Sequence, residues 1–397
     1  MTATSEISEK LAMKPRDRVL AAINHEEPDR VPICIGVSNA TSLKMKPYRA
    51  IKQVAGIDAP DEYMYQWPEL GTAAPDEATL QRLHGDVRGV RDLEPAYVLE
   101  RARARPPHTP FVDSWGSGQI ELAPGEWLPG VNPLREAATI EEILSYPGWP
   151  DMGDPTRVAH VRAQALQLHQ QGEYAIMGTP WLLFPFERAH AMQGMDVYLL
   201  KMAEDPDLAV ALLRRITESC LALMDSFLAE CGDLLDIIKI GDDLGMQSGL
   251  LISPKMYRRM LKPLHAELIA FIKERTRAKV FFHTDGDVFD LIPDFIEIGI
   301  DILNPIQTSA GRMSNLAALK ERYGRDMVFC GGIDTHRVLP FGTPQEVREE
   351  VRRVIHLLGP GGGYMLASVH TLMNDVSAEN ILAMVDAVEE FGRYPLG

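Results

Sequence analysis

The chain of 397 residues contains little cysteine and no long apolar run, and each absence argues against a class of protein. Its four cysteines are Cys34, Cys220, Cys231 and Cys330, and none belongs to a Cys-x-x-Cys pair. The spacing therefore indicates neither a disulfide framework nor a zinc finger, and we expect a reducing, cytoplasmic compartment. No apolar stretch is long enough to span a bilayer, and the polar residues 1–14 do not have the pattern of a signal peptide.

Positive charge is also scarce. Lysine and arginine number 40 against 56 aspartate and glutamate residues, which gives a net charge of -16. That balance argues against nucleic acids and anionic membranes as partners. Nucleotide-binding signatures are missing as well, because no Gly-x-Gly-x-x-Gly follows an early strand and no P-loop occurs.

An even alternation of strand-like and helix-like segments fills the second half of the chain. It predicts parallel strands joined by right-handed crossovers. With a further strand near residues 33–36, it favours a closed (β/α)8 TIM barrel, and an open doubly wound sheet is the alternative. We expect one domain over 1–397, in which 1–110 contribute N-terminal helices and the first barrel strand. The expected later strands are 174–178, 235–241, 279–282, 301–305, 327–331 and 364–367, and a single helix is expected over 186–202.

Polar side chains follow several of these strands. The strand at 279–282 ends on His283, Asp285 and Gly286, and the strand at 235–241 ends on Asp242 and Asp243. Parallel α/β proteins place their chemistry at the carboxyl ends of strands. Asn304, Gln307, Cys330 and His370 follow the later strands, so we expect all of these side chains to converge on one barrel mouth.

Three chemistries suit this set of residues. His283, Asp285 and His370 can bind a divalent metal and leave a fourth position open. Asp242 or Asp285 can act as a general acid or base. The histidines can instead bind an anionic substrate. Structural roles compete with all three, because aspartates at these positions also cap helices or fix loops.

The strand ends lie within motifs that resemble the uroporphyrinogen decarboxylase superfamily, which also includes cobalamin-linked methyltransferases acting on methanol, methylamines or aryl methyl ethers. The shared stretches are Pro-Arg-Asp-Arg-Val at 15–19, Pro-Asp-Arg-Val-Pro at 28–32, Gly-Asp-Asp-Leu-Gly at 241–245, Ile-Ser-Pro at 252–254, His-Thr-Asp-Gly at 283–286, Leu-Asn-Pro-Ile-Gln at 303–307, Gly-Gly-Ile-Asp at 331–334, Gly-Gly-Gly-Tyr-Met-Leu-Ala at 361–367 and Glu-Asn-Ile-Leu-Ala-Met at 379–384.

Two departures from the superfamily narrow the expected reaction. The decarboxylases carry an Arg-Gln-Ala-Gly-Arg stretch after their first strand, whereas this chain has Ile-Cys-Ile-Gly-Val-Ser-Asn at 33–39. The thiol-alkylating methyltransferases hold zinc with a His-x-Cys pair and a later cysteine. Here His283 matches the histidine, Asp285 replaces the first cysteine, and His370 falls near the later one. A zinc ion with these ligands is a harder Lewis acid than one bound by thiolates, and it suits an ether oxygen better than a thiol.

The resemblance implies a methyltransferase that passes a methyl group from a small methoxylated or methylated substrate to the cobalt of a corrinoid. No Asp-x-His-x-x-Gly motif occurs, so we expect a corrinoid protein to supply that cofactor. A homodimer is also implied by the resemblance. The expected catalytic residues are Asp242, Asp243, His283 and Asp285. The expected zinc ligands are His283, Asp285 and His370. The expected substrate contacts are Trp181, Phe186, Asn304, Gln307 and Cys34. A lyase acting on a small carboxylate or a modified tetrapyrrole is the alternative, and a non-enzymatic binding protein on the same barrel is a third.

Overall fold

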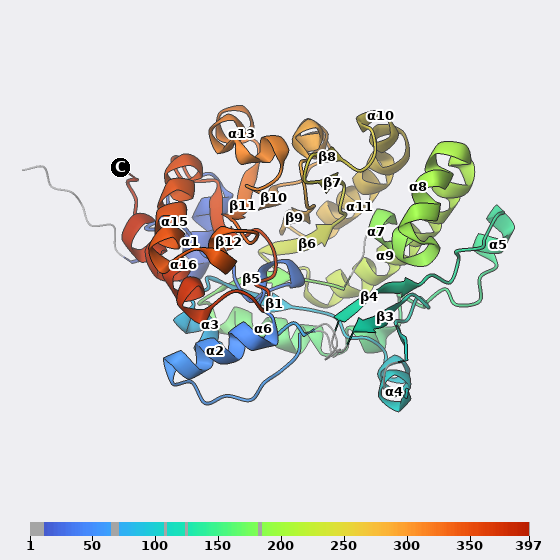
Figure 1. Cartoon of the computed structure of the whole chain (residues 1–397), viewed down its shortest axis with the longest axis horizontal. Helices are drawn as coiled ribbons and strands as arrows, with labels where there is room; N and C mark the ends of the chain where they lie inside the picture. The colour runs from blue at the N-terminus through green and yellow to red at the C-terminus, as the bar shows by residue number, and fades with distance from the viewer. Residues whose placement is uncertain (1–11, 65–70, 107–108, 124–125, 182–184, 397) are drawn as a thin grey trace, which may run out of the picture.

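A curled sheet of parallel strands forms the centre of the molecule, and helices surround it (Figure 1). The computed structural model describes residues 12–64, 71–106, 109–123, 126–181 and 185–396. The seven strands run in the order β1-β5-β6-β9-β10-β11-β12. Their bounds are β1 Val87–Val90, β5 Ala175–Gly178, β6 Ile237–Gly241, β9 Lys279–His283, β10 Ile302–Ile306, β11 Val328–Ile333 and β12 Tyr364–Ser368.

The segment around Ile33 occupies the eighth place and closes the barrel. Ile33 forms a parallel bridge with Leu366 of β12, and the amide of Asp86, just before β1, donates to the Ile33 carbonyl at 2.9 Å. Regular pairing stops there because Gly36 turns the chain with φ +75°. The expected (β/α)8 barrel is therefore confirmed, with its first strand reduced to a single bridge.

Alternate side chains of each strand face two different apolar layers, as the period of a β-strand requires. One layer fills the barrel and includes Ile237, Phe281 and Ile302, with Val19 and Ile23 of helix α1 (Pro15–Ile23) packed against it. The other layer, which includes Ile238 and Phe282, packs against the surrounding helices.

Most helices of the second half begin at a capping side chain, which satisfies a free amide of the first turn. Asp205 accepts from the Leu208 amide, Thr343 and Glu346 form a capping box, and Ser377 accepts from the Asn380 amide. The helices of the second half are α9 Pro206–Cys231, α10 Pro254–Met256, α11 Lys262–Arg275, α12 Ile292–Glu297, α13 Leu316–Tyr323, α14 Val338–Phe341, α15 Pro344–Leu358 and α16 Ala378–Phe391. No helix in the described ranges is both long and apolar enough to cross a bilayer.

The remaining elements differ most from expectation. The single helix expected over 186–202 is two helices, α7 (Pro185–Gln193) and α8 (Met195–Glu204), because Gly194 has φ +88° between them. The other early helices are α2 Met45–Ala55, α3 Glu77–Arg82, α4 Ala96–Ala104, α5 Ile140–Leu144 and α6 Val161–Gln171. An antiparallel sheet of β2 (Phe111–Val112), β3 (Gly118–Ala123) and β4 (Glu126–Val131) projects beside the barrel, and a hairpin of β7 (Gly245–Met246) and β8 (Gly249–Leu250) follows β6 (Figure 1).

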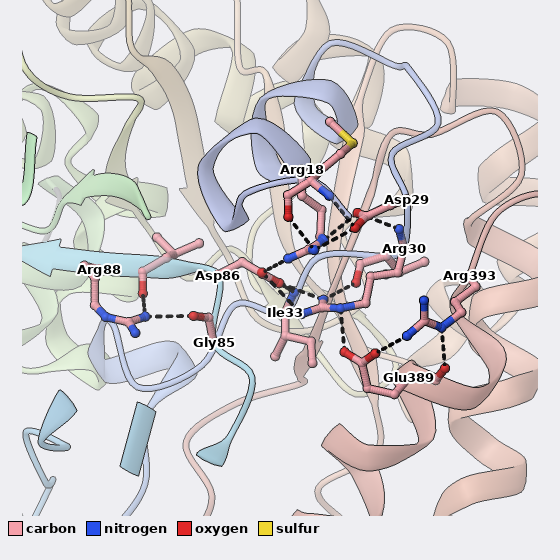
Figure 2. Close-up of polar contacts among 12 residues, drawn as sticks. Arg18, Asp29, Arg30, Ile33, Gly85, Asp86, Arg88, Glu389 and Arg393 are labelled. Carbon is pink, nitrogen blue, oxygen red and sulfur yellow. Dashed lines mark hydrogen bonds and ion pairs between the residues drawn. The ribbon is translucent and has the colours of Figure 1, made fainter. Parts of the chain in front are cut away.

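A buried ion-pair network secures the closing segment at the amino ends of the strands (Figure 2). The Asp86 carboxylate accepts from Arg18 Nη1 at 2.6 Å, Arg30 Nη1 at 2.9 Å and the Ile33 amide at 2.7 Å. Arg18 also forms an ion pair with Asp29, and Arg30 forms one with Glu389. Arg18 lies in the motif at 15–19 and Arg30 in the motif at 28–32, so both motifs stabilise the closure of the barrel.

We expect Asp86→Ala to destabilise the fold strongly, because it leaves two buried arginines without their shared carboxylate. Removing one partner of a buried pair costs about 3–5 kcal/mol. Thermal unfolding followed by circular dichroism should show a midpoint lower by roughly 5–10 °C. As a control, Asp196→Ala removes a carboxylate that is 68% exposed and pairs with Arg135, and should leave the midpoint nearly unchanged. Equal midpoints for the two variants would show that the network does not secure the barrel.

Candidate metal centre at the barrel mouth

Two imidazoles and one carboxylate meet at the carboxyl end of the barrel. His283 ends β9, Asp285 lies two residues further, and His370 follows β12. Their candidate ligand atoms all lie within 4.8 Å of one another. The Asp285 oxygens are 3.9 Å from His283 Nε2 and 3.8 Å from His370 Nε2. The three residues named from the sequence as zinc ligands are thus brought together.

A second residue fixes the orientation of the His283 ring. Asn304 Nδ2 donates to the Cys330 carbonyl at 3.3 Å, which turns its Oδ1 toward His283 Nδ1 at 2.7 Å. An amide oxygen only accepts, so Nδ1 carries the proton and the lone pair of Nε2 faces the carboxylate. Metal-binding histidines are held by partners of this kind. Asn304 is therefore a support for His283 rather than the substrate contact expected.

The carboxylate of Asp285 lacks a partner that its burial demands. Its Oδ1 is buried and accepts no hydrogen bond among the described residues. Burial, and then the charge of Asp243, raise the pKa of Asp285 to about 8. Burial also lowers the pKa of His370 to about 4 and that of His283 well below its usual value, with the charge of Lys239 next in effect. Neutral imidazoles and an unpartnered carboxylate oxygen fit a divalent cation.

A small polar cavity of about 130 Å³ opens beside this cluster. Lys239 of β6 projects into it and donates to Asn39 Oδ1 at 3.2 Å. Glu187 of α7 accepts from the Asp243 amide at 3.0 Å. Burial raises the pKa of the Glu187 and Asp243 carboxyl groups, and the negative charges nearby raise it further. The lining consists of Asn39, Thr179, Pro180, Trp181, Glu187, Lys239, Gly241, Asp243, His283 and His370.

A second cavity of about 840 Å³ lies next to the first, and Glu187 and Asp243 line both. The β7–β8 hairpin, α7, α8 and β4 surround it, with Met195, Met246 and Leu251 among its apolar lining residues. The two acids therefore stand at the boundary between a small polar chamber at the histidines and a larger outer chamber.

Comparison with known proteins assigns the family. Residues 130–391 match the model of the family described as uroporphyrinogen decarboxylase (URO-D). This chain belongs to the uroporphyrinogen decarboxylase family. The matched segment includes His283, Asp285 and His370, and the expected superfamily is confirmed.

Similar proteins agree with that assignment along the chain. A uroporphyrinogen decarboxylase from Methylococcus capsulatus is 25% identical over 70% of this chain and 76% of its own length. One from Alkalilimnicola ehrlichii is 24% identical over 97% of this chain and 96% of its own. A solved structure of a methyltransferase from Methanosarcina mazei superposes with a TM-score of 0.63 at 17% identity, covering 96% of this chain and 99% of that one. At that identity the superposition shows a shared fold.

Asp242 has a structural place in this URO-D family member, which corrects its expected catalytic role. It is fully buried, and its two oxygens accept from the amides of Phe186 and Glu187 at 3.0 and 2.8 Å. Oδ2 also lies 2.9 Å from His265 Nε2. With these partners Asp242 caps α7 and does not face the cavity, whereas its neighbour Asp243 does.

Three of the expected substrate contacts are also corrected, because none lines either cavity. Phe186 is buried against His190 and Tyr198, and Cys34 is buried inside the barrel. Gln307 accepts from the Gly286 amide at 2.7 Å and fixes the loop after β9. Trp181 does line the small cavity, and its contact with a substrate stays a prediction.

The sequence did not single out Lys239, Glu187, Asn39 or Thr179. Lys239 had a signal, because it interrupts an otherwise apolar strand at a position that alternates onto the interior face. Glu187 had none, since a glutamate in the first turn of a helix is common on any protein surface.

We expect Asp285→Asn to raise the thermal stability of the metal-free protein at pH 8 more than at pH 5. The pKa of Asp285 rises from an ordinary value near 4 to about 8 on folding. The folded state then binds more protons between these values, so stability is lost as pH rises through that window. The asparagine variant, which cannot ionise, escapes this loss.

Differential scanning calorimetry of chelator-treated protein measures this effect. The control is Asp290→Asn at an exposed carboxyl whose pKa is lowered by Arg312, and it should give no gain at pH 8. A gain from Asp285→Asn that is equal at the two pH values would contradict the assignment.

Proposed function

We propose that this protein transfers a methyl group from a small methoxylated or methylated compound to the cobalt of a corrinoid, with one zinc ion held by His283, Asp285 and His370. The observation that carries the proposal is the unpartnered, buried oxygen of Asp285 beside two imidazoles, one of which is oriented by Asn304.

The ligand set favours this chemistry. Two imidazoles and one carboxylate suit zinc and leave one position of a tetrahedral ion open. A zinc ion bound there would supply Lewis acidity toward an ether or hydroxyl oxygen. Asn304 would keep the His283 ring in place, while Trp181 and Thr179 would bound the space left for the methylated group.

The dimensions of the two chambers support a methylated donor. The inner chamber of about 130 Å³ is small beside typical ligand pockets of roughly 300–1,000 Å³, so it suits a single methoxy or methyl group. The larger outer chamber would hold the rest of the donor, and the corrinoid would approach the methyl group through it. The superposed Methanosarcina mazei protein is itself a methyltransferase, which is consistent with this use of the fold.

The corrinoid would arrive with a separate corrinoid protein. The sequence carries no Asp-x-His-x-x-Gly motif, the pattern with which corrinoid domains bind cobalamin. A single-chain enzyme with its own cofactor is therefore not what we propose, and the partner protein is part of the proposal.

Decarboxylation is the second candidate, because the two relatives reported above are uroporphyrinogen decarboxylases. The cavities speak against a polycarboxylated substrate. Among the residues that the structure describes, no arginine lines the inner cavity, and Arg135 of the outer chamber is paired with Asp196. Segment 33–39 contains no arginine either. Several carboxylates entering beside Glu187 and Asp243 would meet like charge with few cations to offset it.

Elemental analysis of the purified protein tests the metal. We expect about one zinc per chain, and its loss in His283→Ala/His370→Ala, because removing two of three ligands leaves only Asp285. The matched control is His336→Ala/His356→Ala at two exposed histidines, which should keep the zinc.

Donors are then screened for methylcobalamin formation from cob(I)alamin, followed by visible absorption. Zinc retained by the His283/His370 variant, or absent from every protein, would contradict the metal assignment. Release of carbon dioxide from a carboxylated substrate with no methylcobalamin from any donor would favour the lyase.

A further inference from the structure

Lys239 occupies a position where the barrel interior is otherwise apolar. It lies on β6 between Ile237 and Gly241, on the face that points into the barrel. Its register partner on β9 is Phe281, and the next interior pair above it is Gly241 with His283. A lysine placed here loses most of its hydration, and burial lowers its pKa. An ammonium group at this position in the barrel interior does not improve the packing of the apolar side chains around it.

The ammonium has donors to spare. An ammonium carries three N–H donors, and Nζ of Lys239 donates one hydrogen bond, to Asn39 Oδ1 at 3.2 Å. Within the described ranges no carboxylate oxygen lies within the 4.0 Å of an ion pair from Nζ. Glu187, Asp243 and Asp285 act on it only at longer range. Lys239 is therefore held in place but not neutralised by direct contact.

Lys239 and the two histidines line the same cavity of about 130 Å³. In so small a space, an oxygen that reaches His283 and His370 lies close to the ammonium as well. Lys239 therefore places a positive charge where negative charge would develop on the oxygen of a methylated donor, and a divalent ion held by the histidines would add to it.

We propose that Lys239 is a catalytic residue whose ammonium donates a hydrogen bond to the oxygen that loses the methyl group. The inference rests on the proposed function. The methyl carbon exchanges its bond to oxygen for a bond to cobalt(I) of the corrinoid, whose electron pair forms the new bond. The oxygen keeps the electron pair of the broken bond beside the Lys239 ammonium, and takes a proton from water as the alcohol or phenol leaves.

Anion binding tests this role without turnover. Azide is titrated into the cobalt(II)-substituted protein and followed by visible absorption, with imidazole as the neutral probe. We expect Lys239→Met to weaken azide binding by roughly tenfold to a hundredfold, as for loss of a hydrogen bond to a charged group. Imidazole binding and cobalt content should stay within about threefold.

Two variants serve as controls. Lys239→Arg should recover part of the azide affinity. Lys320→Met removes a half-buried lysine that donates to the Gly362 carbonyl, ahead of β12 at the other end of the barrel, and should change neither probe. Equal azide affinity in wild type and Lys239→Met would overturn the assignment.

Turnover supplies the second readout. With methyl ethers of a series of phenols, Lys239→Met should lower kcat most for the phenols of highest pKa, because the poorest leaving oxygens need the most stabilisation. A uniform loss across the series would show a structural role instead.

Failure of the proposed function looks different. If the wild-type protein takes up no cobalt(II) and yields no methylcobalamin, the metal and the reaction are wrong whatever Lys239 does. Calorimetry of azide binding to the metal-free protein then decides the lysine: a loss in Lys239→Met supports its role in holding an anion, and equal binding overturns it.

Discussion

The closed ring of strands depends on one buried carboxylate. Asp86 binds two arginines and the Ile33 amide, and so fixes an irregular segment in the place of the missing eighth strand. Closure matters for the site because the cavity is lined from both ends of the strand order: Thr179 follows β5, His370 follows β12, and Asn39 lies shortly after the closing segment between them. An open sheet of the same strands would not gather them around one cavity.

Register within the barrel then sets the chemistry. Gly241, His283 and Asn304 are register partners on three adjacent strands. The glycine leaves room beside the histidine, since a Cβ there would lie 2.8 Å from the His283 carbonyl oxygen. The amide on the other side directs Nε2 toward Asp285. Burial disfavours the charged forms of the carboxylates around Lys239, and the lysine and the proposed metal would both favour those forms.

The sequence predicted most of the fold because the signals are local. Alternation defined the strands, and Asp205, Thr343 and Ser377 marked helix starts. The sequence could indicate that His283, Asp285 and His370 lie close together because each follows a strand end, and their binding of a metal stays a prediction. The incorrect predictions for individual site residues have a common cause. A position at a strand end indicates that a side chain lies near the barrel mouth, but it does not indicate which way the side chain points. Asp242 and Asp243 are neighbours in sequence, yet one caps α7 and the other lines the cavity. Gln307 and Cys34 were misplaced for the same reason, and Glu187 comes from a helix whose approach depends on tertiary packing.

X-ray absorption at the zinc edge of the purified protein would identify the ligands of the proposed metal ion. We expect a first shell of nitrogen and oxygen at about 2.0–2.2 Å, with the imidazole scattering of two histidines and no sulfur. Sulfur scattering near 2.3 Å, or a shell without imidazole, would contradict the assignment of His283, Asp285 and His370 as the metal site.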